Sequence, residues 1–339
     1  MTMTATSITK LAQAIILDDV TDVFYRSLVY PFFLRCDEDE KTELQATLDK
    51  KLEVKLGRQL HWTAALTSLD TVTHKFSHFI ELVHSNKLDP NRLNKILADN
   101  YWLKPAFEKA RQGMALSDDV RVRLANPDEG ERVNELVMQI CWHYFHSQMA
   151  QPDQDILSRI FVLSNLFVEQ ALELAEQQNL HVERDDLFQL ALFNAFPMVV
   201  LLRLFDKSMQ SSKQDMLNIV GMENSAERKK IDEYQPSADI LLSFFTFDEF
   251  VKPHVLESLN IPSHLQTNLI LGQDELSDTS RLFLQGRTKA IRDMLGKTLV
   301  LTHAQMEKYK EQLGIEFQVN LSEDVGETQE QVLSKLLAI

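Results

Sequence analysis

The chain has little of what several common classes of protein require. Its 339 residues include only two cysteines and nine glycines. We interpret Cys36 and Cys141 as buried thiols in a reducing compartment, because two cysteines are too few for a disulfide framework or a zinc knuckle. Glycines scattered singly offer no loop whose clustered backbone amides could cradle a phosphate. A disulfide-stapled secreted fold and a glycine-rich nucleotide loop are therefore excluded.

Positive charge is also scarce, with 35 lysines and arginines against 50 acidic residues and a formal net charge of −15. The electrostatic potential of a chain with this net charge repels nucleic-acid phosphates and anionic lipids. No apolar run approaches the roughly 18 residues of a membrane span. The apolar stretch at 11–17 contains Gln13 and is closed by Asp18 and Asp19, unlike a signal sequence. We expect a cytoplasmic protein with no nucleic-acid partner and no membrane span.

The residues that are abundant favour helices. Hydrophobic residues make up 44% of the chain and charged residues 25%, as in ordinary globular proteins. Leucine, alanine, glutamine and glutamate outweigh the β-branched residues, and proline is rare, which is typical of helices joined by short loops. The sequence predicts an all-α protein built on a multi-helix bundle.

Breaks at proline and Asx residues divide the chain into three zones. We predict a helical extension over 1–58, a domain of amphipathic helices over 59–265, and a mostly helical extension over 266–339 that includes a helix at 279–295. Within the last zone, apolar and polar residues alternate from Ile315 to Leu321, the period of a half-buried strand. That strand pairs with 298–301 or with another chain; the alternative is an extended linker.

The segment 187–205 is apolar almost all round, as expected of a helix at the centre of a bundle. Pro197 cannot donate the backbone hydrogen bond of a helix interior but suits the first turn of a helix. We therefore predict that one helix ends near Phe196 and that another begins at Pro197.

Four segments in order carry a resemblance to a known family: Leu97-Ala98-Asp99-Asn100 with Leu103, Phe107 and Ala110; Asp128-Glu129 leading into 133–141; 164–175; and 190–196. Over roughly 60–265 the chain resembles the HDOD domain, the HD-related output domain of bacterial signalling proteins. HDOD domains are relatives of the HD metal-dependent phosphohydrolases. The resemblance implies an HD-like helical bundle and a role in bacterial signal transduction.

Enzymes of the HD families bind metal through scattered histidines and an adjacent His-Asp pair. By the resemblance, the first ligand histidine falls at Leu163, the pair at Asn194-Ala195, and a later histidine near Tyr234. The chain has ten histidines but no His-Asp dipeptide. A hydrolytic metal site needs imidazole or carboxylate ligands. Among Leu163, Asn194 and Ala195, only Asn194 has a possible ligand atom, a single amide oxygen. We expect a vacated site with no catalytic residues, no metal and no cofactor, and Asn194 buried with its amide bonded to a neighbouring carbonyl.

One other set of side chains has metal-ligand spacing. His74, His78 and Glu81 stand at i, i+4 and i+7 of a predicted helix, so all three project from one face. Lys75 occupies the place where the zinc-protease motif has glutamate. A solvated polar face is the plainer interpretation of these residues, and a displaced metal site is the alternative.

The remaining clusters have structural interpretations. In a helix Cys141 points away from His143 and His146, so the three do not share a face. The neighbouring Trp142, Tyr144 and Phe145 suggest a packed aromatic helix end. His254 and His264 flank a predicted loop. Basic residues gather at 228–230 and at Arg281, Arg287, Lys289 and Arg292, where a solvated face is favoured over contact with an acidic partner or a cyclic dinucleotide.

These observations favour a non-catalytic signalling or regulatory protein that binds another protein. The sequence contains no nucleophile elbow and no zinc-protease motif. Self-association is left open. The enzymatic alternative is a metal-dependent phosphohydrolase with displaced ligands. A third alternative is a helical scaffold unrelated to the HD families.

Overall fold

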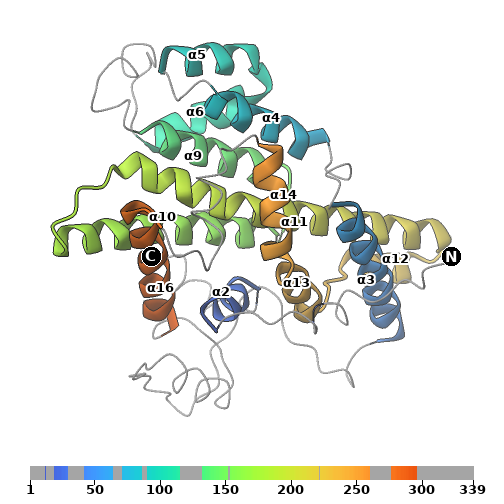
Figure 1. Ribbon diagram of the computed structural model, residues 1–339. Coiled ribbons are helices and arrows are strands. Elements are labelled where there is room, and N and C mark those ends of the chain that lie inside the picture. Colours follow the sequence, from blue (N-terminus) through green and yellow to red (C-terminus); the bar gives the residue numbers. More distant parts are fainter. Residues whose placement is uncertain are drawn as a thin grey trace. The chain divides into compact units, whose positions relative to one another are not determined.

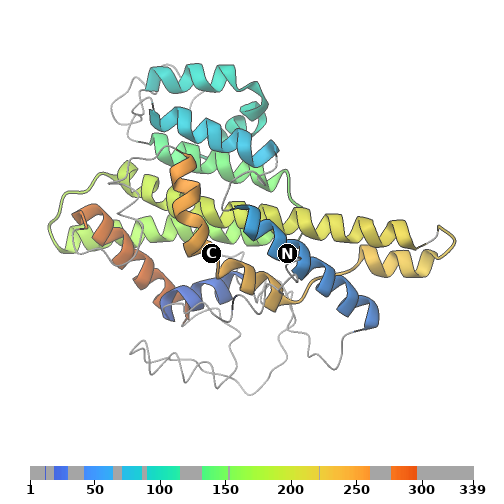
Figure 2. The same ribbon diagram turned by 45° about the vertical axis from the view of Figure 1, so that its right-hand side comes forward.

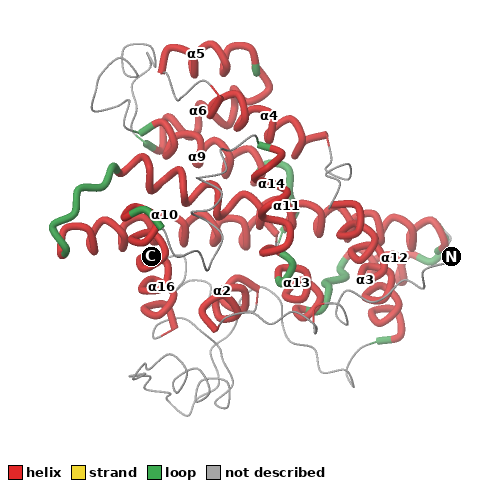
Figure 3. The backbone as a smooth tube through the Cα atoms, in the orientation of Figure 1, coloured by secondary structure: helices red, strands yellow, loops and turns green. Residues whose placement is uncertain are grey.

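A computed structural model of the chain describes residues 12, 19–29, 42–63, 71–85, 90–114, 132–151, 153–220, 222–259 and 276–295. Within these ranges it has twelve α-helices, one 3-10 turn and no strand (Figure 3). The predicted all-α class is confirmed. The strand predicted at 315–321 and its candidate partner at 298–301 lie outside the described residues.

The elements follow one another along the chain and are labelled in Figure 1. Their bounds are α2 Asp19–Val29, α3 Glu43–Thr63, α4 Thr71–Ser85, α5 Pro90–Asp99, the 3-10 turn η2 Tyr101–Leu103, α6 Lys104–Gly113, α9 Val133–His146, α10 Asp153–Gln177, α11 Arg184–Ile219, α12 Ser225–Asp232, α13 Ala238–Phe245, α14 Asp248–Ser258 and α16 Asp278–Leu295. The helix predicted at 279–295 is confirmed as α16.

The chain forms two compact units, each assembled from separated stretches. The first unit comprises 1–55, 208–246 and 288–339, and the second comprises 56–207 and 247–287. The sequence-based division, a domain over 59–265 with an extension on either side, follows chain order and so differs from these units. Helices distant in sequence pack together in each unit, and breaks in the sequence do not reveal such pairings.

The second unit is a stack of helices around an aromatic core. Within it α4 packs on α5, α6 on α9, and α9 on α10, as the views in Figures 1 and 2 show. Phe76 lies at the centre of the aromatic cluster, with ring centroids 5.3 Å from Phe145, 5.4 Å from Phe79 and 6.0 Å from Phe196. All four of these rings are buried. Packed aromatic side chains bury large apolar areas and therefore dominate the stability of such a core.

Helix α11 runs without interruption through Pro197, so the predicted break at Phe196 is wrong. Proline leaves the carbonyl of Phe193 without its usual donor, at a cost of about 3 kcal/mol in a helix interior. The residues on both sides of Pro197, including every one from 198 to 202, are buried. Burial of both halves in one core offsets the lost hydrogen bond and keeps the two halves in a single helix.

Among the described residues, α11 alone is long and apolar enough to span a membrane by length and composition, with a mean hydropathy of 1.8 over the relevant window. That window is 89% buried inside the protein. This burial accounts for the apolar residues around all sides of the helix.

Helix α16 crosses α10 at Gly286. A Cβ atom at this position would lie 2.6 Å from the backbone nitrogen of Ala171 and 2.7 Å from the carbonyl oxygen of Phe167. Glycine therefore lets the two helix backbones approach more closely than any other residue allows. Beside the crossing, the ring of Phe283 packs edge-on against that of Phe167.

The first unit combines apolar packing with polar links between distant segments. Helix α2 packs against α13, and the rings of Tyr25 and Phe245 stack with centroids 6.0 Å apart. Lys55 of α3 forms an ion pair of 2.7 Å with Asp215 near the end of α11. Arg228 of α12 donates to the carbonyl of Leu217, one of the last carbonyls of α11, which lack partners within the helix.

Candidate functional site

Three positions that the HD resemblance singles out lie in the second unit, on α10 and α11. Leu163, Asn194 and Ala195 are 4%, 4% and 0% exposed. The amide nitrogen of Asn194 is buried and has no hydrogen-bond partner among the described residues. The partner carbonyl expected for that nitrogen is therefore not present in the described part of the chain. Since a buried polar group without a partner is destabilising, Asn194 does not owe its place to a stabilising hydrogen bond of its nitrogen.

Tyr234, the fourth position, belongs to the first unit and is also buried. Its hydroxyl donates to a carboxylate oxygen of Asp49 at 2.5 Å. Burial and the adjacent carboxylate raise the pKa of Tyr234 well above its ordinary value. The hydroxyl therefore stays protonated and fastens the segment after α12 to α3.

These residues do not fit a hydrolytic metal centre. Leu163 and Ala195 carry no donor atom, and Asn194 offers a single neutral oxygen. Zinc, iron or manganese sites of this class need several imidazole or carboxylate ligands. Among all residues that the structure describes, no group of three or more histidine, cysteine, aspartate or glutamate side chains is placed to hold a metal ion.

The alternative set of candidate ligands lies on α4. His74 and His78 are exposed, and Glu81 is half-buried. Among these three side chains, Nδ1 of His78 contacts Oε2 of Glu81 at 3.2 Å. The three side chains share a helix face, as predicted, but they do not converge on one point.

The helix end at Cys141 is packed. Cys141 is fully buried, and burial raises the pKa of its thiol well above the ordinary value, which leaves the thiol unreactive. The ring of Trp142 lies 4.3 Å from His143 and 5.5 Å from His146 between centroids. Burial, with Lys109 and His146 nearby, lowers the pKa of His143. His254 is exposed on α14, and His264 lies outside the described residues.

The basic residues differ among themselves. Arg281 pairs with Asp278 at 2.7 Å, and Lys229 pairs with Glu233 at 3.6 Å; both pairs are exposed. Arg228 binds backbone carbonyls, and Arg287 is buried. Exposed pairs such as these contribute little to stability.

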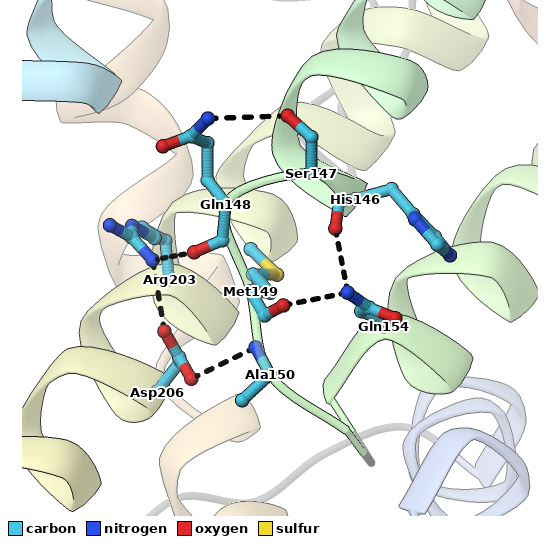
Figure 4. A network of polar contacts seen from close by, with 8 residues as sticks. All are labelled: His146, Ser147, Gln148, Met149, Ala150, Gln154, Arg203 and Asp206. Atoms are coloured by element: carbon cyan, nitrogen blue, oxygen red, sulfur yellow. Dashed lines mark hydrogen bonds and ion pairs between the residues drawn. The ribbon is translucent and has the colours of Figure 1, made fainter.

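The polar network drawn in Figure 4 holds the loop between α9 and α10 in place. Arg203 of α11 donates to the carbonyl of Gln148 at 2.5 Å and to the carboxylate of Asp206 at 2.9 Å. Asp206 in turn accepts from the backbone nitrogen of Ala150 at 3.5 Å. Because Asp206 is only 3% exposed, this carboxylate depends on these donors.

Gln154, on the first turn of α10, completes this network. Its amide nitrogen donates to the carbonyls of His146 at 3.0 Å and Met149 at 2.7 Å (Figure 4). These are carbonyls at and just beyond the end of α9, where helix hydrogen bonds are missing. The network therefore caps a helix end and fastens a loop.

Sequence reasoning missed three polar groups in the second unit. Asp185, at the start of α11, accepts from the backbone nitrogen of Asn134 at 2.7 Å and from its side-chain nitrogen at 2.8 Å. It thus caps α9, a different helix from its own. Its pKa is raised to about 7, chiefly by burial. The sequence signal, acid in a first helical turn, indicated only a cap for α11 itself.

The second missed group is His84, in the last turn of α4. Its Nδ1 lies 3.2 Å from the amide nitrogen of Gln189, and its ring packs edge-on to Phe193 at 4.7 Å. Burial lowers its pKa to about 4, so the imidazole is neutral at pH 7. The third group is Arg159 of α10, whose Nε atom is buried and has no hydrogen-bond partner among the described residues.

The chain has no known neighbour in the comparisons. Searches against protein-family models, curated proteins and solved structures give no match. The residues and their geometry are therefore the whole basis for a functional proposal.

Proposed function

We propose that the protein is a non-catalytic regulator of bacterial signal transduction, a diverged relative of the HDOD domain that acts in the cytoplasm by binding another protein. Its helical bundle keeps the HD-like architecture as a scaffold, and the positions that hold metal in HD enzymes have become part of the apolar core. The alternative, a phosphohydrolase with displaced ligands, would need His74, His78 and Glu81 to converge.

The observation that carries the proposal is the chemistry of Leu163, Asn194 and Ala195. All three are buried, and they offer one neutral oxygen in place of a ligand set. A metal-bound water acquires a pKa near 7 only when several protein ligands hold the ion. The buried centre thus lacks the groups with which an HD enzyme performs hydrolysis.

Tyr101 supports protein binding. Its side chain is 80% exposed on η2, a turn held by the hydrogen bond from the backbone nitrogen of Leu103 to the carbonyl of Asn100. The neighbouring Trp102 donates to the side chain of Asn100 at 3.1 Å and packs edge-on against Tyr144. A rigidly placed, exposed aromatic residue is typical of the anchors that dominate protein interfaces.

A pair of assays tests this proposal. Purified protein with added Mn²⁺ should not hydrolyse bis(p-nitrophenyl) phosphate above a blank without protein. Used as bait in cell extract, the wild type should enrich a protein that Tyr101→Ser loses and that Lys104→Ser, a neighbouring exposed control, retains. Metal-dependent hydrolysis abolished by His78→Ala would favour the phosphohydrolase, and identical enrichment by all three baits would contradict the role of Tyr101.

A further inference from the structure

Arg159 of α10 is a partly buried arginine that has no hydrogen-bond or ion-pair partner among the residues that the structure describes. Its Nε atom is buried and makes no hydrogen bond, and the side chain forms no ion pair among the described residues. Burial alone lowers its pKa, to about 10, with no contribution from a neighbouring charge. The guanidinium nevertheless stays charged at pH 7.

Other partly buried arginines of the second unit are paired. Arg203 binds Asp206 at 2.9 Å, Arg132 binds Glu135 at 2.8 Å, and Arg111 binds Glu108 at 3.0 Å. Removing a charge from water is costly unless an opposite charge or hydrogen-bond acceptors replace the water. In a chain with a net charge of −15, acidic side chains are plentiful, so the missing partner of Arg159 is unusual.

On the C-terminal side of Arg159, the same face of α10 carries two apolar side chains that are at least partly exposed. Val162, at i+3, is 55% exposed, and Leu166, at i+7, is half-buried, so the three side chains follow one face of the helix. The next residue on this face, Glu169, lies 3.5 Å from Arg184. An unpaired guanidinium beside an exposed apolar side chain can recognise an anionic group and an apolar group together.

We propose that Arg159 is the recognition group of a binding site for an oxyanion, a carboxylate or a phosphate group, on a ligand whose apolar part lies against Val162 and Leu166. The guanidinium presents its donors in a planar fork that matches two oxygens of either group. This site is distinct from the protein-binding residue Tyr101, and the two proposals are tested independently.

The test follows the Nε–H resonance of Arg159 by ¹H–¹⁵N NMR of the full chain, assigned by its loss in Arg159→Lys. Benzoate, acetate and inorganic phosphate are titrated against sodium chloride at matched ionic strength. We expect a saturable shift of this resonance with an oxyanion and none with chloride. Saturation by the carboxylates assigns a carboxylate ligand, and saturation by phosphate alone assigns a phosphate ligand. The resonance of Arg281, already paired with Asp278, serves as the control.

Two variants separate the contributions of charge and apolar contact. Benzoate should bind several-fold more tightly than acetate to the wild type, and Val162→Ser should remove this advantage while acetate binding stays unchanged. Arg159→Met should unfold at the wild-type temperature or above, because no ion pair is lost, and its thermal midpoint should no longer rise with the oxyanion. Three outcomes would overturn the proposal. The Arg159 resonance could fail to saturate, or it could shift in parallel with that of Arg281. The thermal midpoint of Arg159→Met could also rise with the oxyanion as much as that of the wild type.

Discussion

The second unit contains two buried places of opposite character. At Leu163, Asn194 and Ala195, the positions that the HD resemblance singles out, the side chains are buried and offer a single amide as their polar group. At the corner between α9 and α10, Arg203, Asp206 and backbone groups are linked by hydrogen bonds (Figure 4). The buried polar groups of the corner fasten a loop and cap a helix, and within the described part of the chain no set of ligand side chains is placed to hold an ion.

The largest effect is expected when a carboxylate is introduced among the buried side chains of Leu163, Asn194 and Ala195. Ala195→Asp buries a charge without partners and should cost about 3–5 kcal/mol of unfolding free energy or prevent folding. Added Mn²⁺ should give no rescue, because Leu163 provides no second ligand. Thermal unfolding with and without Mn²⁺ checks this, with Ala226→Asp on the exposed face of α12 as the control. A Mn²⁺-dependent recovery of stability would mean that a metal site survives.

The next effect is expected at the polar corner. Asp206→Ala removes the partner of Arg203 and of the Ala150 backbone nitrogen, both partly buried, and should cost about 2–3 kcal/mol. The exposed counterpart, Asp278→Ala, removes an ion pair with Arg281 and should cost at most about 0.5 kcal/mol. Urea unfolding compares them. Equal costs for the two variants would show that the corner contributes no more than a surface pair.

Two ionisable groups should give pH dependences of opposite sign. The folded-state pKa of Asp185, about 7, lies above its ordinary 3.8, so its contribution to stability falls as pH rises from about 4 to 7. The folded-state pKa of His84, about 4, lies below 6.5, so its contribution is lost as pH falls from 6.5 toward 4. Each group can change the unfolding free energy by up to about 1.4 kcal/mol per pH unit.

Variants at these two residues test the direction in which each group changes the unfolding free energy with pH. Relative to the wild type, Asp185→Asn should gain stability as pH rises from 4 to 7, and His84→Gln should gain stability as pH falls from 6.5 to 4. Unfolding midpoints measured across this range check both. Parallel curves for the wild type and both variants would contradict the assigned pKa directions.

The smallest effect is expected at Asn194. Its buried amide nitrogen has no partner among the described residues, so Asn194→Leu, of similar volume, should be neutral or stabilise by about 1 kcal/mol. Asn194→Ala leaves a small void and should cost about 1 kcal/mol. A large loss of stability in Asn194→Leu would indicate that the asparagine makes a structural hydrogen bond after all.

Composition and helical periodicity sufficed to predict the all-α class and the helix α16. The continuity of α11 through Pro197 could not be predicted, because local propensity favours a break and burial on both sides overrides it. Asp185 was missed for a related reason: its partner, Asn134, is 51 residues away. For Arg159 the sequence even misleads, since Asp155 at i−4 suggests an ion pair that the structure does not form.

The most direct test of the central claim is the metal content of untagged protein, purified without chelators, incubated with Mn²⁺, Fe²⁺ or Zn²⁺ and passed through a desalting column. We expect far less than one metal ion per chain, both in the wild type and in His78→Ala, because no group of three or more ligand side chains among the described residues is placed to hold an ion. One tightly held ion per chain, lost in His78→Ala or Glu81→Ala, would contradict it and make the phosphohydrolase the better hypothesis.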